Sequence, residues 1–223
     1  MAAAFQLVIS FDHEIYQIVS TSVSISIIAA LIAASLAIPA GISMALNHFR
    51  GKQFLQHLLN TLMAMPTVVI GLLLYGMFSR LGPLGSLGLL YTPTAIITAE
   101  AILIFPIIMN LTVVAVTSAD KRLVPTLKSL GARSITLAFQ VAKQTRFALF
   151  AAIITGFGRA IGEVGAAMML GGNIAGFTRT MTTAIALETS KGEFETGLAL
   201  GLLLLLIAFA INFILSWFQR VQS

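Results

Sequence analysis

Five long apolar segments constrain this chain more than any other feature of its sequence. Each is long enough to cross a hydrocarbon core of ~30 Å, which takes about 20 helical residues. Backbone polar groups cannot stay unpaired in lipid, so we expect helices here and not strands. Pro39, Pro66 and Pro106 lie inside three of the segments and predict local kinks. The predicted spanning helices cover residues 20–46, 58–78, 94–118, 147–170 and 196–217.

Charged residues are too few for a soluble protein. They make up 9% of the chain, whereas soluble domains carry about 25%. Hydrophobic residues make up 58% and the mean hydropathy is +0.98. The net charge of +5 is better explained by basic loops of a membrane protein than by nucleic-acid binding. The chain has no Cys, and its acidic N-terminus, with Asp12 and Glu14, does not resemble a cleavable signal peptide.

Basic residues predict the orientation in the membrane. With the N-terminus outside, nine Lys and Arg residues fall on the cytoplasmic side and three outside, as the positive-inside rule requires. We therefore expect an extracytoplasmic segment (1–19), an all-α polytopic membrane domain with five transmembrane helices (20–217), and a cytoplasmic tail (218–223). The cytoplasmic set is Arg50, Lys52, Lys121, Arg122, Lys128, Arg133, Lys143, Arg146 and Arg220, against Arg80, Arg179 and Lys191 outside.

The cytoplasmic loop of residues 119–146 is basic but also contains regularly spaced apolar residues. This mixture predicts one or two short amphipathic helices, the first of which ends near Gly131. The segment of residues 171–195 reads as a long exterior connection.

No residue pattern supports catalysis. The chain lacks the GxxxxGK[ST] phosphate-binding loop, so it does not bind ATP in that manner. His13, His48 and His57 are scattered over helix ends and loops and predict no metal site. We expect a non-enzymatic protein without catalytic residues or a cofactor of its own.

The fourth apolar segment is rich in glycine. Gly158 and Gly162 have the GxxxG spacing that lets helices approach closely in a membrane, and Gly156 and Gly165 lie beside them. These glycines predict tight helix packing, either within one subunit or across a dimer axis.

Charges also occur within this segment. Arg159 and Glu163 are one helical turn apart, and each would cost ~2.5–3.5 kcal/mol near mid-membrane, so we expect them to pair and to face protein or water. They either border a transport pathway or only brace neighbouring helices. Glu100, early in the third span, either lines the pathway or snorkels to the outer interface.

A group of hydrogen-bond donors follows the fourth segment. Hydroxyls, amides and a guanidinium suit an oxyanion because they donate to several oxygens at once. Polar residues are also common in any exterior loop. The group contains Asn173, Thr178, Arg179, Thr180, Thr182 and Thr183.

The basic loop resembles that of the membrane subunits of type I ABC importers. In that family a Glu-Ala-Ala motif precedes a glycine, and Ile-x-Leu-Pro begins ten residues after it. Here Gly131 matches the glycine and Val141 lies ten residues on, whereas 125–127 (PTL) replaces Glu-Ala-Ala and 143–144 (KQ) replaces Leu-Pro. The missing Glu affects one expected salt bridge to the ATPase and not the docking role of the loop.

A closer resemblance, to the permease subunits of tungstate importers, extends from the second span to the fifth. Relatives of that group carry molybdate or sulfate. The matching runs are 66–74 (PTVVIGLLL), 82–93 (GPLGSLGLLYTP), 156–165 (GFGRAIGEVG), 171–174 (GGNI), 178–180 (TRT) and 182–192 (TTAIALETSKG).

The resemblance implies a type I ABC importer permease fold and a division of labour. Two copies of the chain would form the pore, a separate ATPase dimer would bind Mg-ATP, and an extracytoplasmic binding protein would deliver the anion. The implied substrate is an oxyanion, tungstate first, with molybdate or sulfate as alternatives; an ion-gradient-driven transporter is the rival from another class. The implied ATPase-coupling residues are Leu127, Leu130, Gly131, Ala132, Arg133 and Ser134.

Overall fold

A computed structural model describes residues 13–120 and 122–220, with side chains through residue 211 and at 213. The predictions for residues 1–12, Lys121 and residues 221–223 lie outside the described part of the chain. Every regular element within it is a helix, which confirms the all-α prediction. The elements are α2 (His13–Leu46), α3 (Lys52–Met63), α4 (Thr67–Phe78), η1 (Gly85–Leu87), α5 (Pro93–Thr117), α6 (Leu123–Ser129), α7 (Ser134–Gln144), α8 (Arg146–Ile161), α9 (Gly165–Gly171), α10 (Met181–Lys191) and α11 (Phe194–Arg220).

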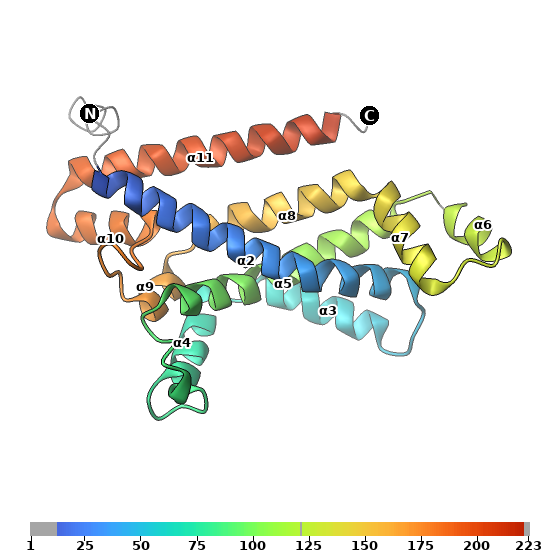
Figure 1. Ribbon diagram of the computed structural model, residues 1–223, viewed down its shortest axis with the longest axis horizontal. Helices are drawn as coiled ribbons and strands as arrows, with labels where there is room; N and C mark the ends of the chain where they lie inside the picture. Colours follow the sequence, from blue (N-terminus) through green and yellow to red (C-terminus); the bar gives the residue numbers. More distant parts are fainter. Residues whose placement is uncertain (1–12, 121, 221–223) are drawn as a thin grey trace.

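Three helices, α2, α5 and α11, are each long and apolar enough to cross a membrane. Two bent pairs, α3 with α4 and α7 with α8, raise the number of spans to five if each pair is counted as one. The long helices run side by side (Figure 1). One end of this bundle carries α9 and α10, and the opposite end carries α6 and α7; we call them the α10 end and the α6 end.

Two predicted helices are interrupted, so their prediction as single helices was wrong. The second breaks at residues 64–66, where a local kink was predicted at Pro66, and its two halves, α3 and α4, meet at 94°. The fourth breaks after Ile161, and α9 begins only at Gly165. Pro39 and Pro106, by contrast, lie within helices that continue past them.

Small residues hold the centre of the bundle together. Ala29, Ala33 and Ala37 of α2 are buried, as are Ala95 and Ala99 of α5, and all belong to one apolar core that α8 also joins. Because methyl groups replace larger side chains at this contact, the helix backbones can approach closely. Packing of this kind needs no hydrophobic driving force between helices.

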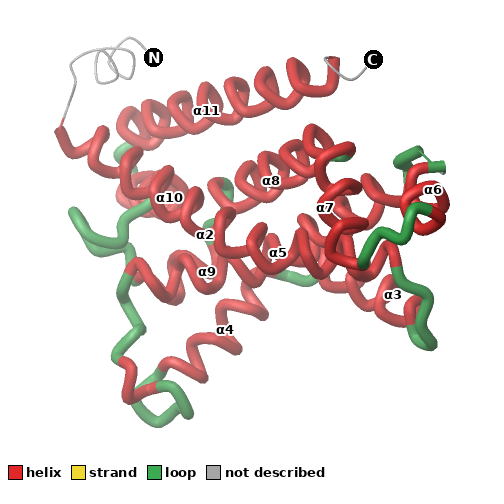
Figure 2. The backbone as a smooth tube through the Cα atoms, turned by 45° about the vertical axis from the view of Figure 1, so that its right-hand side comes forward, coloured by secondary structure: helices red, strands yellow, loops and turns green. Residues whose placement is uncertain are grey.

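The 171–195 segment, predicted as an exterior connection, contains a helix, α10, that the sequence analysis did not predict. Thr180 caps its N-terminus: its hydroxyl accepts from the Thr183 backbone N–H, and the Thr183 hydroxyl accepts from the Thr180 N–H. Gly192, at φ +84°, ends it in the left-handed conformation that glycine adopts without strain. α10 then packs against α11 at this end of the bundle (Figure 2).

The prediction of one or two short helices in the 119–146 segment is confirmed, and the structure has two of them, α6 and α7. Gly131 lies between them with φ +75°, again a left-handed conformation. The Gly131 N–H donates to the Lys128 carbonyl and the Ala132 N–H to the Leu127 carbonyl, so the end of α6 is closed by its own backbone.

Candidate functional site

The break between α8 and α9 is organised around Glu163. Its Oε2 lies 3.2 Å from Arg159 Nη1, and its Oε1 accepts a 3.1 Å hydrogen bond from the Ala166 N–H at the start of α9. The Thr182 hydroxyl of α10 donates to the Glu163 carbonyl at 2.7 Å. This single residue therefore joins α8, α9 and α10.

Arg159 and Glu163 differ sharply in exposure. The Glu163 side chain is 3% exposed and that of Arg159 is 43% exposed. A guanidinium is too costly to leave against lipid tails. The open side of Arg159 must therefore face water or another protein surface.

The glycines on either side of the break between α8 and α9 divide into two groups. A Cβ at Gly162 would meet only the Gly158 carbonyl, at 3.9 Å, and one at Gly158 would meet only Ile211, also at 3.9 Å. Among the side chains that the structure describes, few atoms therefore cover the GxxxG pair. This observation favours the second of our two interpretations, packing across a dimer axis.

The other two glycines pack within the subunit. A Cβ at Gly156 would approach Ile108 of α5 to 2.8 Å, and a Cβ at Gly165 would approach Val68 of α4 to 3.0 Å. Both contacts are closer than is usual for a Cβ, so a larger residue at either position would require the Ile108 or Val68 side chain to shift. These two glycines therefore lie at close helix contacts within the subunit.

Glu100 is buried in α5 with 2% of its surface exposed, so it does not snorkel to an interface. Its neighbours include the Ser26 hydroxyl of α2 and the Glu163 carboxylate. No hydrogen-bond partner of Glu100 Oε2 is present among the described residues. A buried carboxylate beside a second one is an unusual group to keep within a membrane domain.

Two buried serines of α2 also contribute polar contacts, although they were not among the predicted site residues. Ser22 Oγ accepts a 2.6 Å hydrogen bond from the Met181 N–H of α10 and donates to the Ile18 carbonyl. With Ser26, it forms a polar row along the buried side of α2. The spacing of Ser22 and Ser26, four residues apart in an apolar helical segment, was the signal that could have revealed it.

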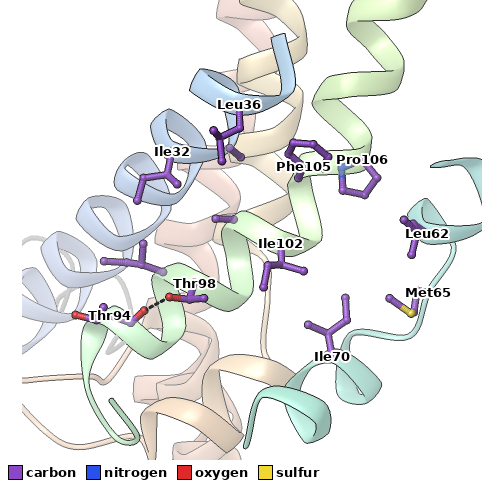
Figure 3. Close-up of a pocket in the computed structure, with 13 residues that line it drawn as sticks. Ile32, Leu36, Leu62, Met65, Ile70, Thr94, Thr98, Ile102, Phe105 and Pro106 are labelled. Carbon is purple, nitrogen blue, oxygen red and sulfur yellow. Dashed lines mark hydrogen bonds between the residues drawn. The ribbon is translucent and has the colours of Figure 1, made fainter. Parts of the chain in front are cut away.

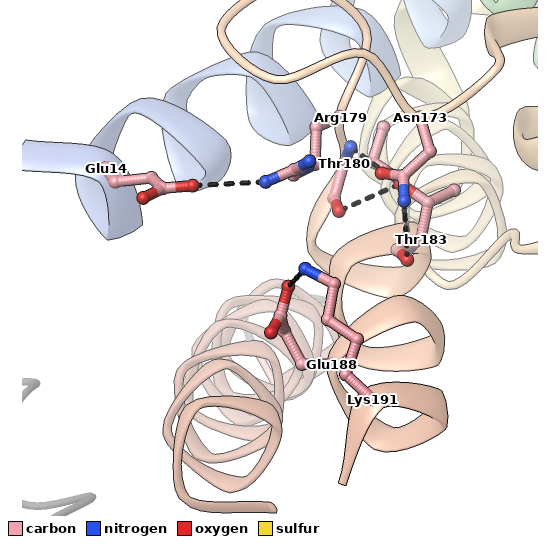
Figure 4. A network of polar contacts seen from close by, with 7 residues as sticks. All are labelled: Glu14, Asn173, Arg179, Thr180, Thr183, Glu188 and Lys191. Carbon is pink, nitrogen blue, oxygen red and sulfur yellow. Dashed lines mark hydrogen bonds and ion pairs between the residues drawn. The ribbon is translucent and has the colours of Figure 1, made fainter. Parts of the chain in front are cut away.

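At the α10 end, the predicted donors gather around Arg179 and Asn173 (Figure 4). Arg179 Nη1 lies 3.1 Å from Glu14 Oε1, and Asn173 Nδ2 donates to the Thr183 carbonyl at 3.4 Å. Arg179 Nε and Asn173 Oδ1 are buried without partners in the described structure. These two side chains retain unused hydrogen-bonding capacity.

The threonine hydroxyls of the same group are already paired. Thr178 Oγ1 donates to the Gly171 carbonyl at 2.6 Å, Thr182 bonds the Glu163 carbonyl, and Thr180 and Thr183 cap α10. Each is buried. To contact a substrate, these hydroxyls would have to break their hydrogen bonds within the chain and form new ones to the substrate.

The α6 end presents apolar side chains beside basic ones. Leu130, Ile135 and Phe139 are 77%, 84% and 67% exposed. Arg133 and Ser134 are exposed as well, while Leu127 and Ala132 are partly covered. Exposed apolar patches of this kind occur where a protein contacts another protein or a membrane.

An apolar pocket of about 410 Å³ lies between α2, α5 and the elbow of α3 and α4 (Figure 3). Its labelled residues include Ile32, Leu36 and Phe105, and the Thr98 hydroxyl is turned to the Thr94 carbonyl. It therefore offers few donors to an oxyanion. Among the described residues, no group of three or more His, Asp or Glu side chains could hold a metal ion.

The fold and these sites describe a polytopic helical membrane protein with exposed apolar and basic side chains at one end and a polar break between α8 and α9. Residues 37–223 match the family described as "Binding-protein-dependent transport system inner membrane component". The chain belongs to this family. Its members are transport components, in line with the prediction that the chain is not an enzyme.

Individual relatives agree with this assignment. The chain is 42% identical to the "Tungstate uptake system permease protein TupB" of Peptoclostridium acidaminophilum, over 98% of this chain and 96% of that protein. The protein of the same name from Campylobacter jejuni is 42% identical over 77% of this chain and 72% of its own. A "Probable anion ABC transporter permease protein" of Haloferax volcanii is 36% identical over 87% and 86%.

A solved structure supports the fold. The crystal structure of an amino acid ABC transporter with histidines matches with a TM-score of 0.67 and 15% sequence identity, and the match covers 95% of each chain. At this identity the likeness concerns the fold alone. It agrees with the predicted ABC importer permease fold.

Proposed function

We propose that this chain is the permease subunit of an ATP-driven importer that carries an oxyanion, with tungstate as the preferred substrate. The observation that carries the proposal is 42% identity over 98% of the chain to a protein named as a tungstate uptake permease. Molybdate and sulfate permeases are more distant, at 26% identity to a molybdenum permease and 28% to a sulfate permease. They remain the alternative substrates.

The α6 end is the docking surface for the ATPase in this proposal. Leu130, Ile135 and Phe139 would fill apolar recesses of the partner, and Gly131 would set the angle between α6 and α7. Mg-ATP would be held by the partner, because the chain has no phosphate-binding loop of its own. Leu127, Ala132, Arg133 and Ser134 complete the coupling set.

The orientation follows from the same surface. Basic residues of the turn between α2 and α3, of α6 and of α7 lie at the α6 end, which supports a cytoplasmic location of this end and an external N-terminus. Binding protein and substrate would then arrive at the α10 end. Asn173 and Arg179, with their unpaired buried atoms, are the candidates for contact there.

Two copies of the chain would enclose the pathway. Arg159 is the cation on the open face of α8, and Gly158 and Gly162 leave room beside it. A positive group at this point would lower the cost of passing an oxyanion through a low-dielectric region. Glu163 would hold Arg159 in place and limit how tightly it binds the anion.

The proposal is tested with the permease and its ATPase in nanodiscs, to which the extracytoplasmic binding protein is added. ATP hydrolysis should rise when the binding protein carries tungstate, less so with molybdate, and least with sulfate. Equal rates with empty and loaded binding protein would overturn the proposal. The rival class, an ion-gradient transporter, would instead take up the anion in ATP-depleted vesicles while an ion gradient is held.

A further inference from the structure

Helix α5 contains a single charged residue, Glu100, and the fold encloses it. Glu100 is buried, and so are Ala99 and Ile96 beside it on the same helix. Ile96 packs with Ile25 of α2 and Ala167 of α9 in one apolar cluster. The Glu100 carboxyl group therefore lies at a closed junction of three helices.

The contacts of Glu100 are those of a neutral group. The Ser26 hydroxyl of α2 forms a hydrogen bond with the carboxyl group, while Oε2 has no partner among the described residues. No ion pair of Glu100 occurs within the part of the chain that the structure describes. An ionised carboxylate is strongly unfavourable in an apolar interior unless a cation or several donors compensate it. Glu100 has neither form of compensation.

The neighbouring carboxylate, Glu163, has the partners that Glu100 lacks. Its Oε2 pairs with Arg159, and its Oε1 accepts the hydrogen bond from the Ala166 N–H. Both contacts favour the ionised form of Glu163. Two carboxyl groups at one site do not ionise together readily, because like charges repel. Glu163 is therefore the ionised member of the pair, and Glu100 the neutral one.

The other titratable groups on the surrounding helices do not change this balance. α9 contains none, and α2 contains none beyond Tyr16. On α4, the Tyr75 hydroxyl is 3.4 Å from that of Tyr91. One cation, Arg159, thus faces two carboxyl groups, and a single proton makes the cluster neutral. The remaining groups on α3 and α8 are Lys52, bonded to the Ala45 and Asn47 carbonyls, the exposed His57, and Arg146, which lies over the Phe147 ring.

A proton suits this place better than a metal ion. Hard metal cations need several oxygen ligands. Both Glu163 oxygens are already used, so Glu100 Oε2 is the one carboxylate oxygen of the pair that lacks a partner among the described residues. One oxygen is too few for a metal ion, but it is enough for a proton.

We propose that Glu100 is a proton-binding site at the junction of α2, α5 and the α8–α9 break, and that loss of its proton loosens this break. On deprotonation the O–H electron pair stays on Glu100, and the proton passes to a solvent hydroxide, which becomes water. The new negative charge repels Glu163, which holds the Ala166 N–H and the Thr182 hydroxyl. The bound proton thus keeps α8, α9 and α10 joined.

Infrared difference spectroscopy on the complex of the permease with its ATPase tests the site directly. The spectrum of the Glu100→Gln complex is subtracted from that of the wild type at about pH 7, where an exposed Glu is ionised. We expect the C=O stretch of a protonated carboxyl group in this difference. The matched control, Glu188→Gln, removes a carboxylate that lies 2.9 Å from Lys191 Nζ and should give carboxylate bands alone. Carboxylate bands alone for Glu100 as well would overturn the proposal.

Thermal unfolding of the same complexes in detergent tests the effect on the break. Deprotonation leaves two buried negative charges against one cation, so the melting temperature of the wild type should fall as the pH is raised from about 7 to about 10. Glu100→Gln should assemble normally, because the amide resembles a neutral carboxyl group in shape, and its melting temperature should fall less. Glu188→Gln should follow the wild type. A Glu100→Gln chain that fails to assemble, or that melts with the pH dependence of the wild type, would contradict the proposal.

The consequence for transport rests on the proposed function. ATP hydrolysis stimulated by the loaded binding protein should fall several-fold at alkaline pH in the wild type and in Glu188→Gln, and less in Glu100→Gln. Identical pH profiles in all three complexes would overturn the link between the proton and the transport cycle. Stimulation that is absent at every pH would instead defeat the proposed function, and the infrared result would still decide whether Glu100 holds a proton.

Discussion

Arg159 and Glu163 form an ion pair in which only the carboxylate is buried. Their atoms are 3.2 Å apart, yet the exposed fractions of the side chains are 43% and 3%. Glu163 also binds the Ala166 N–H and the Thr182 hydroxyl. The carboxylate therefore serves the architecture of the break, while the guanidinium remains accessible on an open face.

This asymmetry predicts different outcomes for stability and transport. Arg159→Ala leaves a buried carboxylate without its cation and should destabilise the chain by about 1–3 kcal/mol. Adding Glu163→Gln removes the charge but keeps an acceptor for the Ala166 N–H, so thermal stability in detergent should largely return. If Arg159 lines the pathway as proposed, uptake by the double variant should stay low, because the pathway would have lost its cation.

The same double variant also distinguishes a pathway role of Arg159 from a purely structural one. If the pair only braced α8 and α9, the double variant would regain uptake together with stability. Recovery of both would refute a pathway role for Arg159.

Gly131 offers a test of coupling with a matched partner in the same chain. Both Gly131 and Gly51 have positive φ, +75° and +95°, and neither has an atom near an added Cβ. Gly131→Arg should abolish ATP hydrolysis stimulated by loaded binding protein, because the new side chain stands on the docking surface. Gly51→Arg, in the turn between α2 and α3 at the same end, carries a similar backbone strain and should retain most of the stimulation. Similar losses in both variants would point to strain and not to docking.

The threonines at the start of α10 separate a structural role from substrate contact. Thr180→Ala removes the cap of α10 and should cost about 1 kcal/mol of stability. The substrate concentration for half-maximal uptake should not change, because the Thr180 hydroxyl is already paired within the chain. Ser190→Ala, in the exposed last turn of the same helix, serves as the control and should change neither quantity. A several-fold shift in that concentration for Thr180→Ala would favour direct contact with the anion.

Gly41 tests the close packing of α2 against α5. An added Cβ would lie 2.8 Å from Thr112 Cβ and 2.9 Å from the Met109 carbonyl, and the latter is backbone that cannot turn aside. Gly41→Ala should therefore lower stability by about 1–3 kcal/mol. Gly201→Ala, in open space, should lower it little or not at all, as thermal unfolding of the purified proteins would measure. An equal effect of both substitutions would contradict the packing described here.

Much of the fold could be predicted from the sequence, because lipid imposes long apolar helices whatever their neighbours. The breaks in the second and fourth predicted helices could not be predicted. Pro66 was visible, but a bend of 94° depends on what α4 packs against. The break after Ile161 depends on two hydrogen bonds that Glu163 accepts, one from the Ala166 N–H of α9 and one from the Thr182 hydroxyl of α10.

The residues of the candidate site could be predicted from the sequence, but the role of each residue could not. The spacing of Arg159 and Glu163 predicted a pair, but not that one partner would be buried. The GxxxG spacing could not say which glycines face the subunit and which face outward. The threonines looked like free donors because the sequence does not show the caps and carbonyls that use their hydroxyls.

The central claim is that the segment with α6 and α7 faces the cytosol and is moved by a separate ATPase. Because the chain contains no Cys, Arg133→Cys gives a single label site on this surface. A membrane-impermeant maleimide should modify it in inside-out vesicles, and bound ATPase should protect it. Modification from the outside of intact cells would contradict the account, since no cytoplasmic motor could then reach the segment.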